Sequence, residues 1–172
     1  MAASTTDIHE EYEKSFEQAM EMLESGHKKQ DILNFLVYTA EKAAGSDTVS
    51  SILVLDKDGL LRNAASPGLP SDYINKIDGL KPNARVGTCA AAAATSSIII
   101  TEDFCADDKW EELRHLPLAL GFKSAWSMPI LNDRQKVIGT FGTYFYQHRT
   151  PTIQEIAGVK LLANAAAKIL GD

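Results

Sequence analysis

The sequence predicts an α/β protein of the α+β kind, in which an antiparallel sheet forms the middle layer of an α/β/α sandwich. Amphipathic helical patterns occupy both ends of the 172-residue chain. Two hairpin patterns lie between them, and a hairpin joins antiparallel strands. Because an amphipathic helix must bury its apolar stripe against another element, the helices before and after the sheet are expected to cover it.

The chain begins with an acidic amphipathic helix, which is predicted over residues 1–26. Apolar side chains recur at three- and four-residue spacing from Ile8 to Leu23. Gly26 ends the helix, because glycine tolerates the left-handed cap conformation. The same segment holds seven carboxylates and one lysine, so it carries the whole formal net charge of −6. Residues 27–172 are electrically balanced and are predicted to form a single domain that begins with a second amphipathic helix.

The middle of the chain alternates strand patterns with turns and short helices. Asp56–Gly59 and Asn132–Gln135 are turn sequences between β-rich runs, which predicts two hairpins. A run of five alanines has the highest helix propensity, and Thr152–Glu155 is a capping box that opens the last helix. In chain order the predicted elements are a second helix that stops at Gly45, strands at 49–55 and 60–65, a helix at 72–77 capped by Ser71, a loop at 79–87, a helix at 88–95, a strand at 98–100, a helix at 107–120, strands at 123–131 and 136–146, and a final helix from 152.

Composition and charge exclude several classes of protein. Hydrophobic residues make up 45% and charged residues 23%, as in an ordinary globular domain rather than a disordered chain. A balanced body with an acidic arm lacks the basic clusters that nucleic-acid binding needs. No apolar run reaches the roughly 20 residues of a membrane span, and the start of the chain lacks the pattern of a signal peptide. Two cysteines cannot build a disulfide scaffold, and the four scattered histidines predict no metal site. We expect a soluble cytoplasmic protein.

Two stretches carry more specific information, and the first is Asn83–Ala90. It is a loop containing Gly87 that leads directly into the alanine helix. Unpaired N–H groups at a helix start suit a small anion or the polar head of a ligand, and Thr88 and Cys89 would supply them. The alternative interpretation is structural: Gly87 makes the turn, and the alanines pack closely on the sheet.

The second stretch is Gly121–Ile130, which places Trp126 on a predicted strand. Trp126 is either a core residue or a pocket wall that offers an indole donor. Because both faces of the sheet are covered, the order of residues does not decide which face meets a pocket. Cys89 and Cys105 are a redox pair, two buried thiols or unrelated residues. No catalytic constellation is visible.

Both stretches belong to a run of motifs that resembles the GAF family, the small-molecule-sensing domains of bacterial signalling proteins. The resemblance covers roughly residues 30–170 and is closest to the subgroup found beside histidine kinase and diguanylate cyclase modules. The matching segments are Val86–Ala91, Ile98–Asp103, Trp110, Leu113–Arg114, Leu120–Ile130, Val137–Phe141 and Pro151–Thr152.

The resemblance implies terminal helices on one face of the sheet and, on the other, loops and short helices that enclose a pocket. It implies a non-catalytic sensor without a cofactor, which binds a small polar or anionic ligand and signals through its terminal helices or a partner protein. A homodimer through the terminal helices and a sensor kinase as partner are expected. The predicted ligand-binding residues are Asn63, Gly87, Thr88, Cys89, Phe104, Ser124, Ala125, Trp126 and Thr143.

Two alternatives to a sensor stay open. Relatives of the family include free methionine-R-sulfoxide reductases, which place a thiol close to the position of Cys89 and use further cysteines, of which only Cys105 is present here. The other alternative is a ligand-free dimerisation or interaction module. A bilin chromophore is not expected, because bilin-binding members have a His after the attachment Cys, and Ala106 follows Cys105.

Overall fold

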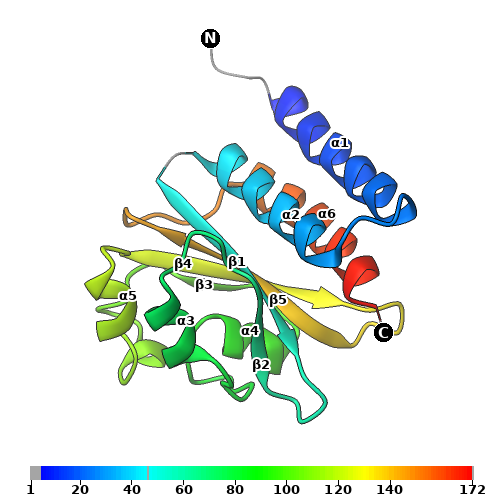
Figure 1. Ribbon diagram of the computed structural model, residues 1–172. Helices are drawn as coiled ribbons and strands as arrows, with labels where there is room; N and C mark the ends of the chain where they lie inside the picture. The colour runs from blue at the N-terminus through cyan, green and yellow to red at the C-terminus, as the bar shows by residue number, and fades with distance from the viewer. Residues whose placement is uncertain (1–4, 46, 172) are drawn as a thin grey trace.

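The computed structural model describes residues 5–45 and 47–171, arranged in layers around one sheet (Figure 1). Helices and strands alternate much as the sequence predicts. The elements are α1 (Thr5–Glu24), α2 (Lys29–Ala44), β1 (Thr48–Leu55), β2 (Leu61–Ala65), α3 (Ser71–Ile77), α4 (Cys89–Thr95), β3 (Ile99–Thr101), the 3-10 turn η1 (Asp108–Trp110), α5 (His115–Ala119), β4 (Ser124–Leu131), β5 (Val137–Phe145) and α6 (Ile153–Leu170).

The sheet has five antiparallel strands in the order β2-β1-β5-β4-β3. The two predicted hairpins are the pairs β1–β2 and β4–β5, and β5 joins them at the centre of the sheet by pairing with β1. The antiparallel sheet and the mixed helical and sheet class are therefore confirmed. The capping box is also present: the Thr152 hydroxyl accepts from the Glu155 N–H, and the Glu155 carboxylate accepts from the Thr152 N–H.

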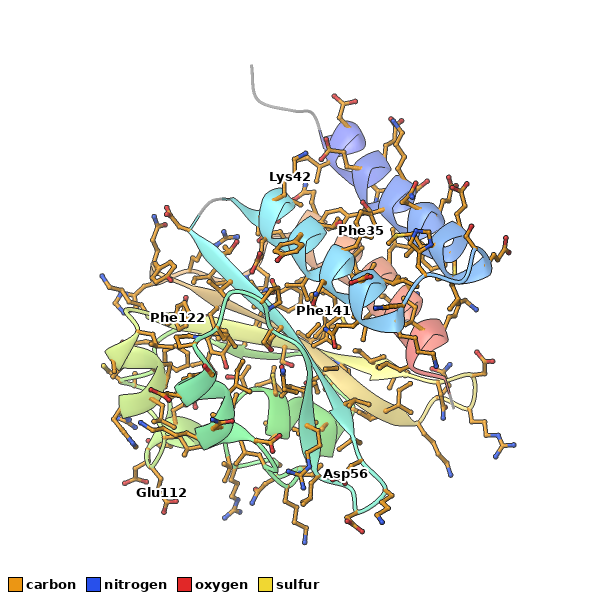
Figure 2. All side chains as sticks on the ribbon, viewed as in Figure 1. Phe35, Lys42, Asp56, Glu112, Phe122 and Phe141 are labelled. Carbon is orange, nitrogen blue, oxygen red and sulfur yellow. The ribbon has the colours of Figure 1, made fainter. Side chains whose placement is uncertain are left out.

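Helices α2 and α6 lie on one face of the sheet, α2 against β1 and α6 against β4 (Figure 1). The largest core cluster fills this interface with side chains from both helices and from the strands, among them Phe141. The other face is covered by α3, α4, α5 and the loops that join them (Figure 1). A second cluster lies on that side and includes Phe122, so the two phenylalanines mark opposite faces of the sheet (Figure 2).

Helix α1 forms an additional outer layer on α6 and α2. Its apolar stripe faces inward, with Tyr12 and Ala19 buried. Tyr12 lies against Gly158 so closely that a Cβ on that glycine would be 2.2 Å from the tyrosine ring. The Tyr12 hydroxyl is buried without a hydrogen-bond partner, and burial raises its pKa to about 12. The Tyr12 ring therefore fixes the acidic helix to the domain by packing into the space above Gly158, where a side chain is absent. We call this contact the Tyr12 notch.

Two local predictions differ from the structure. The single helix predicted over 107–120 is instead the 3-10 turn η1 followed by the five-residue α5. Pro117 explains the break, because proline has no N–H for a helix that runs through it and is tolerated only in a first turn. The other difference concerns α3, where Pro70 occupies the N-cap position and Ser71 is the first helical residue, so Ser71 makes no capping bond. The helices described between residues 5 and 171 are each too short or too polar to cross a bilayer.

Candidate functional site

A small cavity lies on the face of the sheet opposite α2 and α6. Its volume is about 30 Å³, which is room for one or two water molecules. Strands β1, β4 and β5 form its floor, and the start of α4, the end of α3 and η1 surround it. The lining residues are Leu53, Ile77, Leu80, Gly87, Thr88, Cys89, Ala90, Trp110, Ala125, Trp126, Gly142, Thr143 and Tyr144.

A row of small residues on three neighbouring strands lies beside the cavity, under the start of α4. Gly142 of β5 pairs with Ser51 of β1 on one side and with Ser127 of β4 on the other. The start of α4 rests directly on this row, because a Cβ at Gly142 would lie 2.9 Å from the Cys89 sulfur. The Ser127 hydroxyl donates to that sulfur at 3.3 Å. Burial raises the pKa of the Cys89 thiol, so the sulfur is held in its neutral form at the edge of the cavity.

One wall of the cavity is a chain of side-chain hydrogen bonds. The Trp110 indole N–H donates to the Thr88 hydroxyl at 2.8 Å, and that hydroxyl lies 2.9 Å from the Thr101 hydroxyl. The backbone turns into α4 at Gly87, whose φ of +65° is in the left-handed region and whose N–H donates to the carbonyl of Lys109. The turn therefore brings Trp110 and Thr88 together, and both are almost fully buried.

The opposite wall is an aromatic pair that joins α3 to β5. The hydroxyls of Tyr73 and Tyr144 are 2.7 Å apart, and their rings meet edge to face. Burial raises the pKa of both phenols, so both are neutral donors at any physiological pH. Tyr144 reaches the cavity, whereas Tyr73 supports it from behind. This bond ties the short helix α3, which carries the cavity residue Ile77, to the central strand.

The lining has no charged side chain: every residue around the cavity is apolar, a glycine, a hydroxyl, a thiol or an aromatic. In the parts of the chain that the structure describes, no three His, Cys, Asp or Glu side chains gather as a metal site. The chemistry on offer is therefore hydrogen bonding by neutral groups and apolar contact.

Five of the predicted site residues lie on this side of the sheet. Gly87, Thr88, Cys89 and Ala125 line the cavity directly. Phe104 is fully buried one layer behind, with its ring against Trp110 at a centroid distance of 4.7 Å.

The other four predicted residues point elsewhere. The Trp126 side chain belongs to the cluster under α2 and α6, and the Thr143 hydroxyl bonds to Ser50 at 3.1 Å. By strand alternation both side chains face the helices, so Trp126 and Thr143 border the cavity with their backbone only. Ser124 bonds to the loop before α6 through the carbonyl of Gln147. Asn63 is exposed on β2 and is not part of the lining.

Sequence reasoning missed several residues of the lining, above all Tyr144, Ile77 and Leu53. Tyr144 could have been found by counting from Gly142, since both face the same side of β5. Ile77 could not, because its place depends on how α3 folds back over the sheet.

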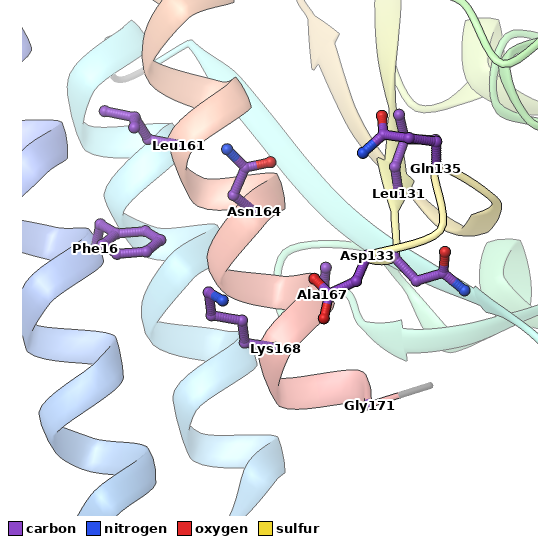
Figure 3. Close-up of a pocket in the computed structure, with 10 residues that line it drawn as sticks. Phe16, Leu131, Asp133, Gln135, Leu161, Asn164, Ala167, Lys168 and Gly171 are labelled. Carbon is purple, nitrogen blue, oxygen red and sulfur yellow. The ribbon is translucent and has the colours of Figure 1, made fainter.

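A larger hollow lies on the helical side of the molecule, where α6 meets α1 and the turn between β4 and β5 (Figure 3). It has a volume of about 670 Å³ and is open to solvent. Half of its residues are polar, and among these Asn164 and Lys168 of α6 and Asp133 of the turn are exposed (Figure 3). These side chains do not converge on a buried point, so the small cavity is the better candidate site.

The comparisons with known proteins agree with this architecture. A family model described as the GAF domain matches residues 27–170. Among solved structures, the GAF domain of a phosphoenolpyruvate-protein phosphotransferase from Coxiella burnetii is 17% identical, with 94% of each chain covered and a TM-score of 0.74. A domain assigned to a two-component sensor histidine kinase of Sinorhizobium meliloti 1021 is 21% identical, with 81% of this chain and 88% of that chain covered and a TM-score of 0.68.

A third solved structure is an enzyme. The free methionine-R-sulfoxide reductase from Neisseria meningitidis, in complex with its substrate, is 15% identical, with 98% of this chain and 92% of that chain covered and a TM-score of 0.71. At such identities these likenesses show the fold alone. Among curated proteins, none matches the chain.

Proposed function

The chain belongs to the GAF domain family, and we propose that it is a non-catalytic sensing domain that binds a small molecule in the cavity under α4. The observation that carries the proposal is the enclosure of the cavity by neutral polar side chains from separate elements, Thr88 at the N-cap of α4, Trp110 of η1 and Tyr144 of β5. Buried hydroxyls are costly unless they are paired, so a group of them around a hollow is typical of a binding site.

The size of the cavity limits how a ligand enters. About 30 Å³ is too small for an amino acid or an oxoacid, so binding of such a molecule requires α3 and residues 79–87 to move outward. The elements that would move are short, and the Tyr73–Tyr144 hydrogen bond is the side-chain link that holds α3 to the central strand. Ligand entry would therefore break one neutral hydrogen bond, worth about 1 kcal/mol.

The same strands that form the cavity floor also support the helices. Tyr144 faces the cavity, whereas its neighbour Phe145 belongs to the core under α2 and α6. A displacement of β5 by ligand would act on both faces, which supports signalling through the terminal helices. Such coupling requires different contacts in two states.

A reductase is the second candidate, because the Cys89 thiol lines the cavity. Nucleophilic thiols act as thiolates, and burial raises the pKa of this one. The lining also offers no carboxylate or imidazole to accept a proton. Both features favour a sensor. Reduction of free methionine sulfoxide with thioredoxin as electron donor, abolished by Cys89→Ser, would instead establish the enzyme.

The proposed sensor is tested by a thermal-shift screen of small anions, amino acids, oxoacids, amides and nucleotides. A ligand of the cavity should raise the melting temperature by a few degrees at concentrations well above its Kd. The same ligand should fail with Ala125→Val, which fills the cavity from its floor. Ala119→Val is the matched control, because Ala119 is exposed at the end of α5 and outside the lining. If no compound stabilises the protein, the ligand-free interaction module becomes the better account.

The predicted homodimer is proposed along the outer face of α6, where Ile153 is 83% exposed, Ala157 is also exposed, and the half-buried Leu161 follows at the same four-residue spacing. The outer face of α1 is unsuitable for a symmetric contact, because it would bring two sets of seven carboxylates together. Sedimentation at several concentrations should show a dimer that Ile153→Asp shifts to monomer, whereas Gln18→Asp, with the same charge change on α1, should not. A monomer at all concentrations would refute the dimer.

A further inference from the structure

We infer that the ligand of this cavity is an uncharged small molecule with a carbonyl-type acceptor oxygen, bound by the hydroxyls of Tyr144 and Thr88. The inference deepens the proposed sensing function and rests on it. It follows from the charges around the cavity and from an accounting of its hydrogen-bond donors.

The charge of the lining excludes a good site for an anion. Arg, Lys and His side chains are absent from the residues around the cavity, as are Asp and Glu. An ion that leaves water for such a place loses its hydration and gains no opposite charge in return, which disfavours binding strongly. The first turn of α4 offers little compensation, because the helix has only seven residues and its dipole is correspondingly small. A neutral ligand avoids the cost.

The aromatic wall, formed by Tyr73 and Tyr144, has two hydroxyl protons but only one hydrogen bond between the two residues. Tyr73 and Tyr144 share a single hydrogen bond, in which one phenol donates and the other accepts. Across residues 5–45 and 47–171, neither phenol oxygen makes another hydrogen bond. When Tyr73 is the donor, the proton of Tyr144 is left over, and Tyr144 is the member of the pair that reaches the cavity.

The hydrogen bonds of Thr88, on the wall formed by Thr88 and Trp110, also leave a hydroxyl proton without an acceptor. The Thr88 hydroxyl accepts from Trp110 and shares one hydrogen bond with the Thr101 hydroxyl. When Thr101 donates in that bond, the Thr88 proton is free, and Thr88 lines the cavity. Two neutral O–H donors are therefore available from opposite walls, with no acceptor of their own. Ordinary hydroxyls rotate to suit a partner, so a ligand oxygen with two lone pairs can satisfy both.

The rest of the cavity is apolar, with Leu53, Ile77, Leu80 and Ala125 among its residues. A ligand that suits it has an apolar body and one acceptor oxygen, as ketones, amides and esters have. A carboxylate has the same shape as an amide but brings the charge that the lining cannot balance. A hydrocarbon has the body but leaves the spare proton of each hydroxyl without an acceptor, which disfavours its binding relative to an amide.

The experiment compares three compounds of one shape: benzamide, benzoate and toluene. Binding to the full chain is measured by thermal shift and by titration calorimetry at pH 7.5. We expect benzamide to stabilise the protein, with at least tenfold weaker binding of benzoate and of toluene. Acetamide and acetate, a smaller pair that needs less movement of α3, should show the same order.

Variants then locate the donors. Tyr144→Phe should lower the ratio of benzamide affinity to toluene affinity about tenfold, because loss of the Tyr73–Tyr144 hydrogen bond eases the entry of both compounds equally and only benzamide loses a donor. Tyr146→Phe is the matched control, because it removes a phenol hydroxyl from a side chain that is 40% exposed and outside the lining. Circular dichroism and the urea midpoint show that each variant is folded.

The possible results distinguish a failure of the inferred ligand class from a failure of the proposed sensing function. Tighter binding of benzoate than of benzamide would overturn the inference and leave a sensor of anions. Equal binding of toluene and benzamide would overturn the role of the acceptor oxygen. No binding in any arm, including the broader screen above, would overturn the sensing function itself.

Discussion

Substitution of Gly158 by alanine should release helix α1 from the domain. The Cβ of an alanine at this position would lie 2.2 Å from two ring carbons of Tyr12, which is far inside van der Waals contact. The surrounding α6 backbone is held by the helix and by the sheet beneath it, so the ring must move. Because Tyr12 is only 1% exposed, it can leave only by displacing α1.

The size of the effect follows from three contributions. Removing a large buried aromatic from its site costs about 3–5 kcal/mol. Alanine in place of glycine in a helix returns about 1 kcal/mol, and the unpaired hydroxyl of Tyr12 regains water, which returns about 1–3 kcal/mol. Taken at their midpoints, the three contributions leave a net loss of about 1 kcal/mol, concentrated in α1.

Hydrogen exchange and urea unfolding measure the two parts of this prediction. Amides of α1 should exchange about fivefold faster in Gly158→Ala, while those of the central strands follow the global stability. Ala157→Gly is the matched control, because it lowers the helix propensity of α6 by about 1 kcal/mol without touching Tyr12.

A double-mutant cycle gives the sharpest test of the notch. In a Tyr12→Ala background the ring is gone, so Gly158→Ala should become stabilising by about 1 kcal/mol through helix propensity alone. If Gly158→Ala has the same effect in both backgrounds, the close contact between these two residues does not fix α1.

Three further predictions concern Thr143 of β5, Cys89 of α4 and Glu41 of α2. Thr143→Val should lower the free energy of unfolding by about 1–2 kcal/mol, because it strands the buried Ser50 hydroxyl, and should leave ligand affinity in the thermal-shift screen unchanged. Cys89 should react with iodoacetamide more slowly than the exposed Cys105 at pH 7 and gain speed only at alkaline pH, because burial raises the pKa of its thiol; equal rates, measured by mass spectrometry, would contradict this. Burial also raises the pKa of Glu41 in the folded state, so its contribution to stability is fully present below the unfolded pKa and is lost as the pH rises through the folded one. Glu41→Gln should therefore gain stability relative to wild type between pH 4 and pH 7 in urea titrations, and a difference that does not change with pH would refute the assignment.

Local signals were sufficient to predict most of the fold. The hairpin turns, the alanine helix and the Thr152–Glu155 capping box each depend on residues within one or two turns of chain, and the structure contains all of them. The helix predicted over 107–120 failed for the same reason, because the single residue Pro117 interrupts a pattern that is otherwise helical.

The site was harder to predict because it depends on the register between strands and on which face of the sheet each side chain occupies. Every residue from Ser124 to Ile130 is buried, so the strand shows no alternation that would assign Trp126 to one side. The row of small residues that receives α4 comes from three strands, and it exists only once Gly142 is placed opposite both Ser51 and Ser127. A glycine inside a helix, such as Gly158, indicates that another side chain approaches the helix closely. The sequence does not identify that side chain, because Tyr12 lies in a helix far away along the chain.

The two features that sequence reasoning missed, the Tyr144 wall and the Tyr12 notch, are joined by a continuous series of contacts. Phe145, next to Tyr144, receives the guanidinium of Arg149 over its ring at 4.2 Å. Arg149 is paired with Glu155, which caps α6 one turn before Gly158. Contiguity alone does not couple two sites, since coupling needs an element with two arrangements. Helix α1 has a property of such an element, because in its docked state the buried Tyr12 hydroxyl has no hydrogen-bond partner among the described residues. A ligand that shifts β5 should therefore change the exchange of α1 amides before that of any other helix.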